Sequence, residues 1–192
     1  MVANPQFQYM SSQEYLEWEK TQELRYEYID GEVFLRTVKT IVHNRICFNL
    51  YIQLNDFLVD KGWEIYACEV KLKITRKSYH YPDVVVTCDE RDKESIDLVE
   101  YPCLIVEVLS PSTEAFDRGK KFTRYRQSTT LQEYVLIASD EIGVECFRRN
   151  DQGLWVLHTY GEGDTLNLES VGISIPVEKL YRRVRFDLGE KN

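Results

Sequence analysis

The chain has 192 residues, a net charge of −8, 43% hydrophobic residues and 29% charged residues. This composition is typical of a globular protein, and the length suffices for one domain with a substantial core. The acidic net charge argues against nucleic-acid binding over the whole surface, but it allows a local basic face. No apolar run approaches the roughly 18 residues that span a bilayer, and the N-terminus lacks a secretory signal, so we expect a cytoplasmic protein without membrane association.

Three elements are predicted before residue 60. SSQEYLEWEKTQE begins with a serine cap, Ser11 or Ser12, and Glu14 follows Ser11 in a capping-box pattern that predicts a helix. LRYEYIDGEVFLRT alternates around Asp30-Gly31, a dipeptide favoured in tight hairpin turns. Between about residues 40 and 59 apolar residues recur at helical spacing and predict a long helix; they are Ile46, Leu50, Ile52, Leu54 and Leu58.

The central part of the chain changes to strand patterns. WEIYACEVKLKI and YPDVVVTC resemble successive strands, and the polar loop DERDKESIDLVEY leads to CLIVEVL. CLIVEVL shows no polar alternation, which is typical of a strand covered on both faces. Cys88 and Cys103 fall within these apolar runs, and we expect both to be buried. None of the five cysteines shows the CxxC spacing of a structural zinc site.

The remainder predicts a helix followed by strands. Pro111 ends the strand before it, and Ser112 or Thr113 can cap a helix across roughly 114–128. LQEYVLIA is another strand, VECFRRNDQGLWVLHTY is a hairpin, and short strands with a small helix near Pro176 follow. We therefore expect one α/β (α+β) domain over residues 1–187, with a mixed β-sheet flanked by helices, an N-terminal helix and hairpin, and a C-terminal tail at 188–192.

Two carboxylates stand in the predicted strands. Asp83 lies near the start of one and Glu107 near the end of the other. If the strands are neighbours, both carboxylates can point at one spot, where they would repel each other unless a cation lies between them. Mg²⁺ suits such a site, because it needs only one or two protein carboxylates. Alternatively, Asp83 caps a loop and Glu107 pairs with a basic side chain.

The predicted helix at 114–128 carries Asp117, Lys121 and Tyr125 on one face. A lysine near a bound metal can orient water and stabilise negative charge on a phosphate. The apolar arc of the helix places Lys121 at its rim, beside Tyr125, and Lys120 almost opposite. Alternatively, Asp117 and Lys121 form an ordinary exposed ion pair.

These segments together resemble a known family. The order YEYIDGEV, VHN opening a helix, YPDVVV, LIVEVLSPSTEAFDRGKKFTRYR and LQEYVLI is similar to the Uma2 family over about residues 12 to 186. The resemblance implies the restriction-endonuclease-like αβββαβ core of the PD-(D/E)xK nuclease superfamily. Carried over, its PD falls on Pro82-Asp83 and its acidic residue on Glu107. Leu109 stands where the motif has lysine, and relatives with this pattern point to Lys121 on the following helix instead.

Together, residues and resemblance favour an Mg²⁺- or Mn²⁺-dependent endonuclease that hydrolyses DNA phosphodiester bonds without an organic cofactor. The metal ligands would be Asp83, Glu107 and the backbone carbonyl of Val108, with Lys121 acting on water or the transition state. Supporting residues would be Glu27, His43, Asp117 and Tyr125. Basic residues at 118–126 are candidates for DNA phosphates, namely Arg118, Lys120, Arg124 and Arg126.

Two further expectations follow. A small nuclease that cuts both strands commonly needs two active sites, so we expect a homodimer. A second basic cluster, YRRVR at 181–185, can be a nucleic-acid contact or simply solvated surface. The alternative function is a catalytically inactive nucleic-acid- or protein-binding module that keeps the nuclease fold, which the acidic charge and Leu109 favour.

Overall fold

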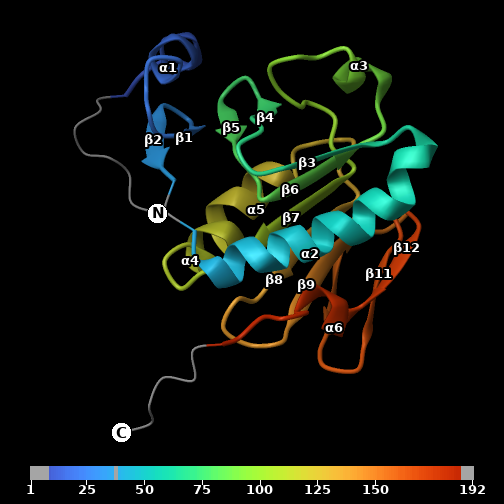
Figure 1. Ribbon diagram of the computed structural model, residues 1–192. Helices are drawn as coiled ribbons and strands as arrows, with labels where there is room; N and C mark the ends of the chain where they lie inside the picture. Colours follow the sequence, from blue (N-terminus) through green and yellow to red (C-terminus); the bar gives the residue numbers. More distant parts are fainter. Residues whose placement is uncertain (1–8, 37–38, 187–192) are drawn as a thin grey trace, which may run out of the picture.

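A six-stranded mixed sheet forms the centre of the computed structural model, which describes residues 9–36 and 39–186 (Figure 1). The strand order is β10-β9-β8-β7-β6-β3, with β3 (Glu64–Ala67), β6 (Val84–Thr87), β7 (Leu104–Val108), β8 (Glu133–Ile137), β9 (Val144–Arg149) and β10 (Trp155–Tyr160). Only β7 and β8 run parallel among its neighbouring pairs. A parallel pair needs a crossover connection, and the segment between β7 and β8 is helical.

Helices cover both faces of this sheet (Figure 1). On one face lie α2 (Ile41–Leu58), the two-stranded sheet β11 (Thr165–Leu168)–β12 (Ile173–Pro176) and α6 (Val177–Leu180). On the other lies the crossover helix, made of α4 (Glu114–Phe116), a π-helical turn (Asp117–Lys121) and α5 (Phe122–Tyr125). β7 is buried along its whole length, as the unbroken apolar run predicts. The expected mixed sheet flanked by helices is confirmed.

The N-terminal part builds a second, four-stranded sheet. Its order is β2-β1-β5-β4, with β1 (Tyr26–Ile29), β2 (Glu32–Leu35), β4 (Leu72–Thr75) and β5 (Ser78–His80), and α1 (Ser12–Glu19) packs beside it. Ser11 and Glu14 form the predicted capping box. Asp30 and Gly31 both have positive φ, 50° and 98°, which is the backbone that a tight hairpin turn requires. This sheet positions Glu27 and His80.

The structure departs from the sequence predictions at several points. WEIYACEVKLKI is divided between two sheets, because Cys68 and Glu69 adopt positive φ values of 54° and 64° and turn the chain out of β3. Cys88 is exposed, whereas Cys103 is buried as predicted. The polar loop contains a one-turn helix, α3 (Glu90–Lys93), and a 3-10 turn (Val59–Lys61) extends α2. Ile52 is half exposed rather than part of the core.

The predicted helix at 114–128 ends earlier, at Tyr125, and its middle turn is π-helical. The single domain over 1–187 stays a prediction, and its last residue and the tail at 188–192 lie outside the described residues. Among the described residues, no helix combines the length and apolar character needed to cross a membrane.

Candidate functional site

Asp83 and Glu107 lie opposite each other on neighbouring strands. β6 pairs antiparallel with β7, with Val84 opposite Val106. Asp83 directly precedes β6, so extending this register by one residue places it opposite Glu107. The backbone N–H of Val108 donates a 2.8 Å hydrogen bond to Oδ2 of Asp83. Both carboxylates are buried. The strand pairing on which the sequence prediction depended is therefore present, as the register of β6 and β7 shows.

Lys121 lies among three buried carboxylates. Its Nζ is 2.9 Å from Oε1 of Glu107, 3.1 Å from Oε1 of Glu27 and 3.2 Å from Oδ1 of Asp117. Lys120, by contrast, is exposed and pairs with Glu32. Lys121 therefore faces the carboxylates, as the helical arc predicts, and the alternative of an ordinary exposed Asp117–Lys121 pair is wrong.

The crossover topology explains this convergence. The crossover helix starts soon after β7 ends and packs back across the sheet, so its second turn returns over Glu107. The π-helical turn carries both Asp117 and Lys121, and π-helical turns are frequent at functional sites. Leu109 is buried in the apolar cluster beside the crossover helix. The ammonium group therefore comes from the helix rather than from the strand.

The electrostatics reflect three carboxylates around one ammonium. Burial raises the pKa of Glu107 to about 8; Lys121 opposes the increase and the other carboxylates add to it. Burial would also raise the pKa of Glu27, but Lys121 and His80 outweigh it and hold the pKa at about 2. Burial would lower the pKa of Lys121, whereas the carboxylates raise it well above its usual value. The buried site therefore has more carboxylates than the lysine can neutralise.

Tyr125 and His80 hold two of these carboxylates. The hydroxyl of Tyr125 donates a 2.8 Å hydrogen bond to Oε1 of Glu107. Burial raises the pKa of Tyr125 well above its usual value, so it remains a donor. Nδ1 of His80 lies 3.2 Å from Oε2 of Glu27, and Nε2 lies 2.7 Å from Oγ of Ser78. Burial lowers the pKa of His80, so the neutral ring donates from Nδ1 to Glu27 and accepts from Ser78.

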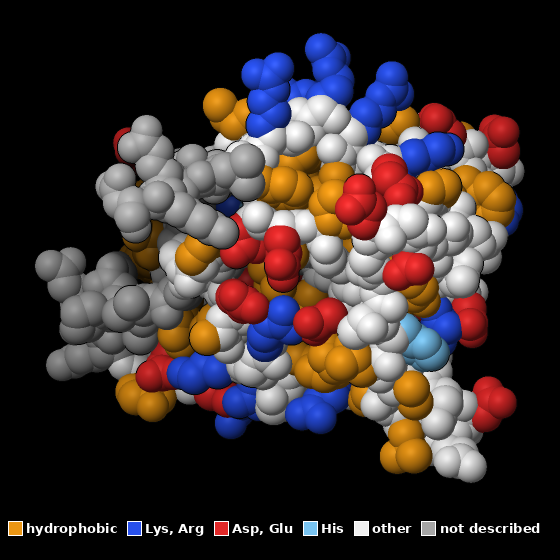
Figure 2. Space-filling model, turned by 90° about the horizontal axis from the view of Figure 1, so that it is seen from below, with side chains coloured by type: hydrophobic (Ala, Val, Ile, Leu, Met, Phe, Trp, Pro, Cys, Tyr) orange, Lys and Arg blue, Asp and Glu red, His pale blue; other side chains and the backbone are white. Residues whose placement is uncertain are grey.

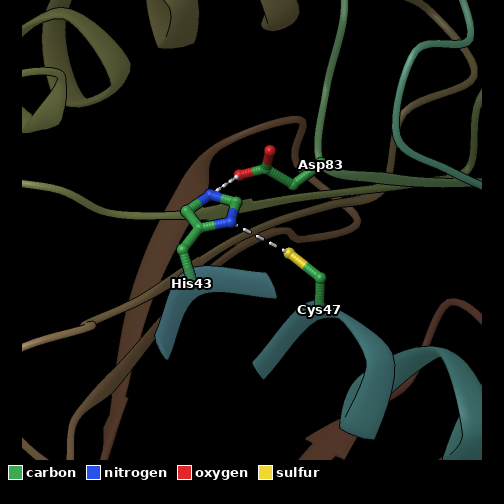
Figure 3. A group of neighbouring side chains, drawn as sticks. All are labelled: His43, Cys47 and Asp83. Atoms are coloured by element: carbon green, nitrogen blue, oxygen red, sulfur yellow. Dashed lines mark hydrogen bonds and ion pairs between the residues drawn. The ribbon is translucent and has the colours of Figure 1, made fainter. Parts of the chain in front are cut away.

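His43 connects Asp83 to Cys47 (Figure 3). Nε2 of His43 is 2.9 Å from Oδ2 of Asp83, and Nδ1 is 3.5 Å from Sγ of Cys47, one helical turn further along α2. A carboxylate only accepts, so Nε2 carries the proton and Nδ1 accepts from the thiol. Burial raises the pKa of Cys47 and keeps the thiol protonated. His, Cys and Asp can together bind a metal, but here the imidazole uses both nitrogens as a hydrogen-bond bridge.

Two cations that the sequence analysis did not identify lie at the entrance. Nζ of Lys39 is 3.2 Å and Nη2 of Arg36 is 3.8 Å from Oδ1 of Asp83. Both line an open cavity of about 370 Å³ that reaches Asp83 and a crevice of about 10 Å³ beside Lys121. Their segment follows the hairpin and precedes α2, and only tertiary structure brings it to the site.

The predicted phosphate-binding residues lie outside this centre. Arg118 pairs with Glu114 and Glu145, Lys120 with Glu32, and Arg124 with Asp30, while the Arg126 guanidinium lies over the Phe122 ring. Three of the four cations are therefore offset by acids of the same chain. On the face in Figure 2, acidic and basic side chains are mixed across the middle, and several Lys and Arg side chains project from one edge.

The donor set suits a hard divalent ion. Among the described residues, Oδ1 of Asp83 and Oδ1 of Asp117 are buried and accept no hydrogen bond. Each lies 3.2 Å from an ammonium group, of Lys39 and of Lys121 respectively. A buried carboxylate oxygen that accepts no hydrogen bond can still take a metal ion as a ligand. Carboxylate oxygens are the ligands that Mg²⁺ and Mn²⁺ prefer. The buried residues therefore fit a divalent ion at the Asp83–Glu107 position.

Comparisons with known proteins identify the fold and the family of the chain. The family described as "Uma2: Putative restriction endonuclease" matches residues 12–178. Two uncharacterized proteins of Synechocystis sp., slr1290 and sll1609, are 39% and 36% identical, covering 94% and 77% of this chain and 95% and 85% of their own lengths. The crystal structure of "a putative nuclease belonging to DUF820" from Anabaena variabilis has a TM-score of 0.76 at 17% identity, covering 90% of this chain and 97% of that one. The fold is thus that of a nuclease-like structure, and the chain belongs to the Uma2 family of putative restriction endonucleases.

Proposed function

We propose that this protein is a divalent-metal-dependent endonuclease that hydrolyses DNA phosphodiester bonds. The observation that carries the proposal is the buried cluster of Glu27, Glu107 and Asp117 around Lys121, beside Asp83. Burying such an excess of carboxylates is unfavourable unless protons or a cation neutralise them. A domain selected for stability alone would gain by replacing them with apolar side chains.

Asp83, Glu107 and the backbone carbonyl of Val108 would hold Mg²⁺ or Mn²⁺. When bound, the ion supplies Lewis-acid polarisation of a phosphoryl oxygen and lowers the pKa of water. His43 positions Asp83 by donating to Oδ2, and Oδ1, which faces Lys39 and Arg36, would be the ligand atom. Tyr125 fixes Glu107 in the same way through Oε1.

Lys121, Arg36 and Lys39 would act on the substrate. Lys121 carries a buried positive charge, and a charge delivered in a site shielded from water stabilises a developing phosphorane strongly. Arg36 and Lys39 line the open cavity that leads to Asp83. The guanidinium and ammonium groups of these two residues suit a backbone phosphate of the substrate. DNA is the proposed substrate because the family consists of putative restriction endonucleases.

A cleavage assay tests the proposal. Supercoiled plasmid and single-stranded DNA are incubated separately with the protein and Mg²⁺, Mn²⁺ or EDTA. We expect cleavage with either metal and none with EDTA. Mn²⁺ should also raise the melting temperature, because a ligand that binds only the folded state stabilises it. Asp83→Ala and Glu107→Ala should lose both effects. Asp89→Ala, which changes the cap of helix α3 outside the site, should keep both.

The inactive binding module is the other outcome of this experiment. Absence of cleavage together with absence of a Mn²⁺-dependent shift in melting temperature would reject the nuclease proposal. Retention of DNA in a gel-shift assay under those conditions would favour a nucleic-acid-binding module instead. A Mn²⁺ shift without cleavage would mean that the carboxylates bind metal but that DNA is the wrong substrate.

A further inference from the structure

The outward face of α2 carries a line of apolar side chains. Ile41, Phe48, Ile52 and Val59 are 80%, 57%, 49% and 55% exposed, whereas the opposite face of α2 packs on the central sheet. Val59 follows the last residue of α2 with helical dihedral angles. At about 100° per residue, the four side chains fall within roughly 20° of one line along the helix. A solvated helix face carries polar residues instead.

The apolar line is symmetric about residue 50. Ile41 and Val59 are equally distant from that position, and so are Phe48 and Ile52. Two copies of α2 packed antiparallel about a twofold axis there would place Ile41 against the partner's Val59 and Phe48 against the partner's Ile52. A twofold interface requires this self-complementarity, because each patch must bind its own copy.

The charges at the two ends of the line are complementary. The N-terminal end borders a cavity of about 380 Å³ whose charged lining residues are Arg45, Arg183 and Arg185. The C-terminal end carries the exposed Asp56 and Asp60. Within the described part of the chain, none of these five residues forms an ion pair. Antiparallel packing brings each basic end against an acidic end, which adds electrostatic complementarity to the apolar contact.

We propose that the exposed face of α2 binds a second copy of this chain as an antiparallel helix pair with its twofold axis at residue 50. Arg45 then meets the partner's Asp56 on both sides of the axis. The 18 residues of α2 give a contact about 27 Å long. A DNA backbone fits this face poorly, because its phosphates need cations along the contact and Phe48 and Ile52 occupy the middle.

The oligomeric state and two single substitutions test the proposal. In sedimentation velocity at micromolar concentration, the protein should sediment as a particle of twice the 22.7 kDa chain mass. Phe48→Glu and Ile52→Glu should each produce monomers, because a carboxylate would be buried in the apolar contact. Ile96→Glu is the matched control: Ile96 is 95% exposed and lies outside α2, so this variant should remain dimeric.

A charge exchange tests the antiparallel register. Arg45→Glu places a carboxylate against the partner's Asp56 and should weaken the dimer on the order of 30-fold or more. Asp56→Arg should do the same, and the two changes combined should restore dimerisation. Arg45 and Asp56 of one chain lie roughly 16 Å apart along α2, so restoration cannot arise within a chain.

Three results would overturn the proposal: a monomeric wild-type protein, a dimer that survives Phe48→Glu, or a combined variant that stays as weak as its parents. A monomeric wild type whose DNA affinity falls with Arg45→Glu would assign these arginines to a nucleic-acid contact. Circular dichroism and melting curves establish that each variant is folded. The combined Arg45→Glu and Asp56→Arg variant adds no charge to the apolar line and remains informative if Phe48→Glu unfolds.

Discussion

Lys121 neutralises part of the charge of three buried carboxylates, Glu27, Glu107 and Asp117. The sequence alone suggests that Lys121→Met would leave the fold intact. Its burial changes that expectation, since removing one partner of a buried ionic cluster leaves uncompensated charge. In EDTA at neutral pH we expect Lys121→Met to lower the free energy of unfolding by about 3–5 kcal/mol, as measured by urea denaturation.

The same substitution should reduce cleavage in Mg²⁺ by roughly 10²-fold or more, because one charge-stabilising group is lost. Lys120→Met is the matched control, since Lys120 is exposed and one position away. It should change the free energy of unfolding by no more than about 0.5 kcal/mol, and should only weaken DNA binding and its salt dependence. A cleavage-deficient Lys120→Met beside an active Lys121→Met would contradict the assignment.

Glu107 predicts a pH dependence of stability in the metal-free protein. Its pKa is about 8 in the folded state and 4.5 in its ordinary state, so the folded protein keeps a proton that the unfolded chain releases. This contribution to stability is fully present below about pH 4.5 and is lost as the pH rises through about 8. Between about pH 5 and about pH 9 in EDTA, the melting temperature of the wild type should therefore fall more steeply with pH than that of Glu107→Gln. Parallel curves would contradict the raised pKa.

Sequence reasoning found the carboxylates, the lysine and two residues that hold carboxylates, His43 and Tyr125, but it missed His80, Arg36 and Lys39. Asp83, Glu107 and Lys121 are recognisable because motif spacing and helical periodicity are local properties. His80 ends β5 of the second sheet, just before Pro82-Asp83, and Arg36 follows β2. Neither residue belongs to the motif or to the helical periodicity. Their roles follow from tertiary contacts alone.

At the scale of elements, the hairpin β1–β2 fixes Glu27, and its turn depends on Gly31. Gly31 has φ of 98°, and a Cβ atom there would lie 2.5 Å from a ring carbon of Tyr9. Gly31→Ala should therefore lower the free energy of unfolding by about 1–2 kcal/mol. Gly119→Ala is the matched control, because a Cβ atom there meets nothing within 4 Å in the crossover helix. It should be neutral or stabilising by up to about 1 kcal/mol. Equal destabilisation of the two variants in urea denaturation would contradict this account.

The accuracy of the sequence predictions varies among elements for physical reasons. The α1 cap and the Asp30-Gly31 turn were predictable because a few adjacent side chains determine them. The break at Cys68 and Glu69 was not, since neither residue type favours positive φ and tertiary contacts must impose it. The π-helical turn was missed for a different reason: over a single turn, the periodicity of a π-helix differs little from that of an α-helix.

At the scale of the whole molecule, the proposed dimer would bring together two of the proposed active sites. His43 lies near the N-terminal end of α2, so the antiparallel pair would separate the two copies of His43 by about 20 Å along the helix axes. A particle that holds both sites can cut the second strand before DNA dissociates. A monomer has to bind the nicked product again.

This difference predicts how plasmid cleavage proceeds. With Mg²⁺ the wild type should convert supercoiled plasmid to the linear form with little nicked intermediate. Phe48→Glu should accumulate nicked circles, because second-strand cleavage loses the advantage of a tethered site and slows by roughly 10²-fold. Ile96→Glu should behave as the wild type does. If Phe48→Glu is monomeric by sedimentation yet linearises plasmid at the wild-type rate, one site suffices for both strands. In that case the α2 contact would serve assembly without serving cleavage.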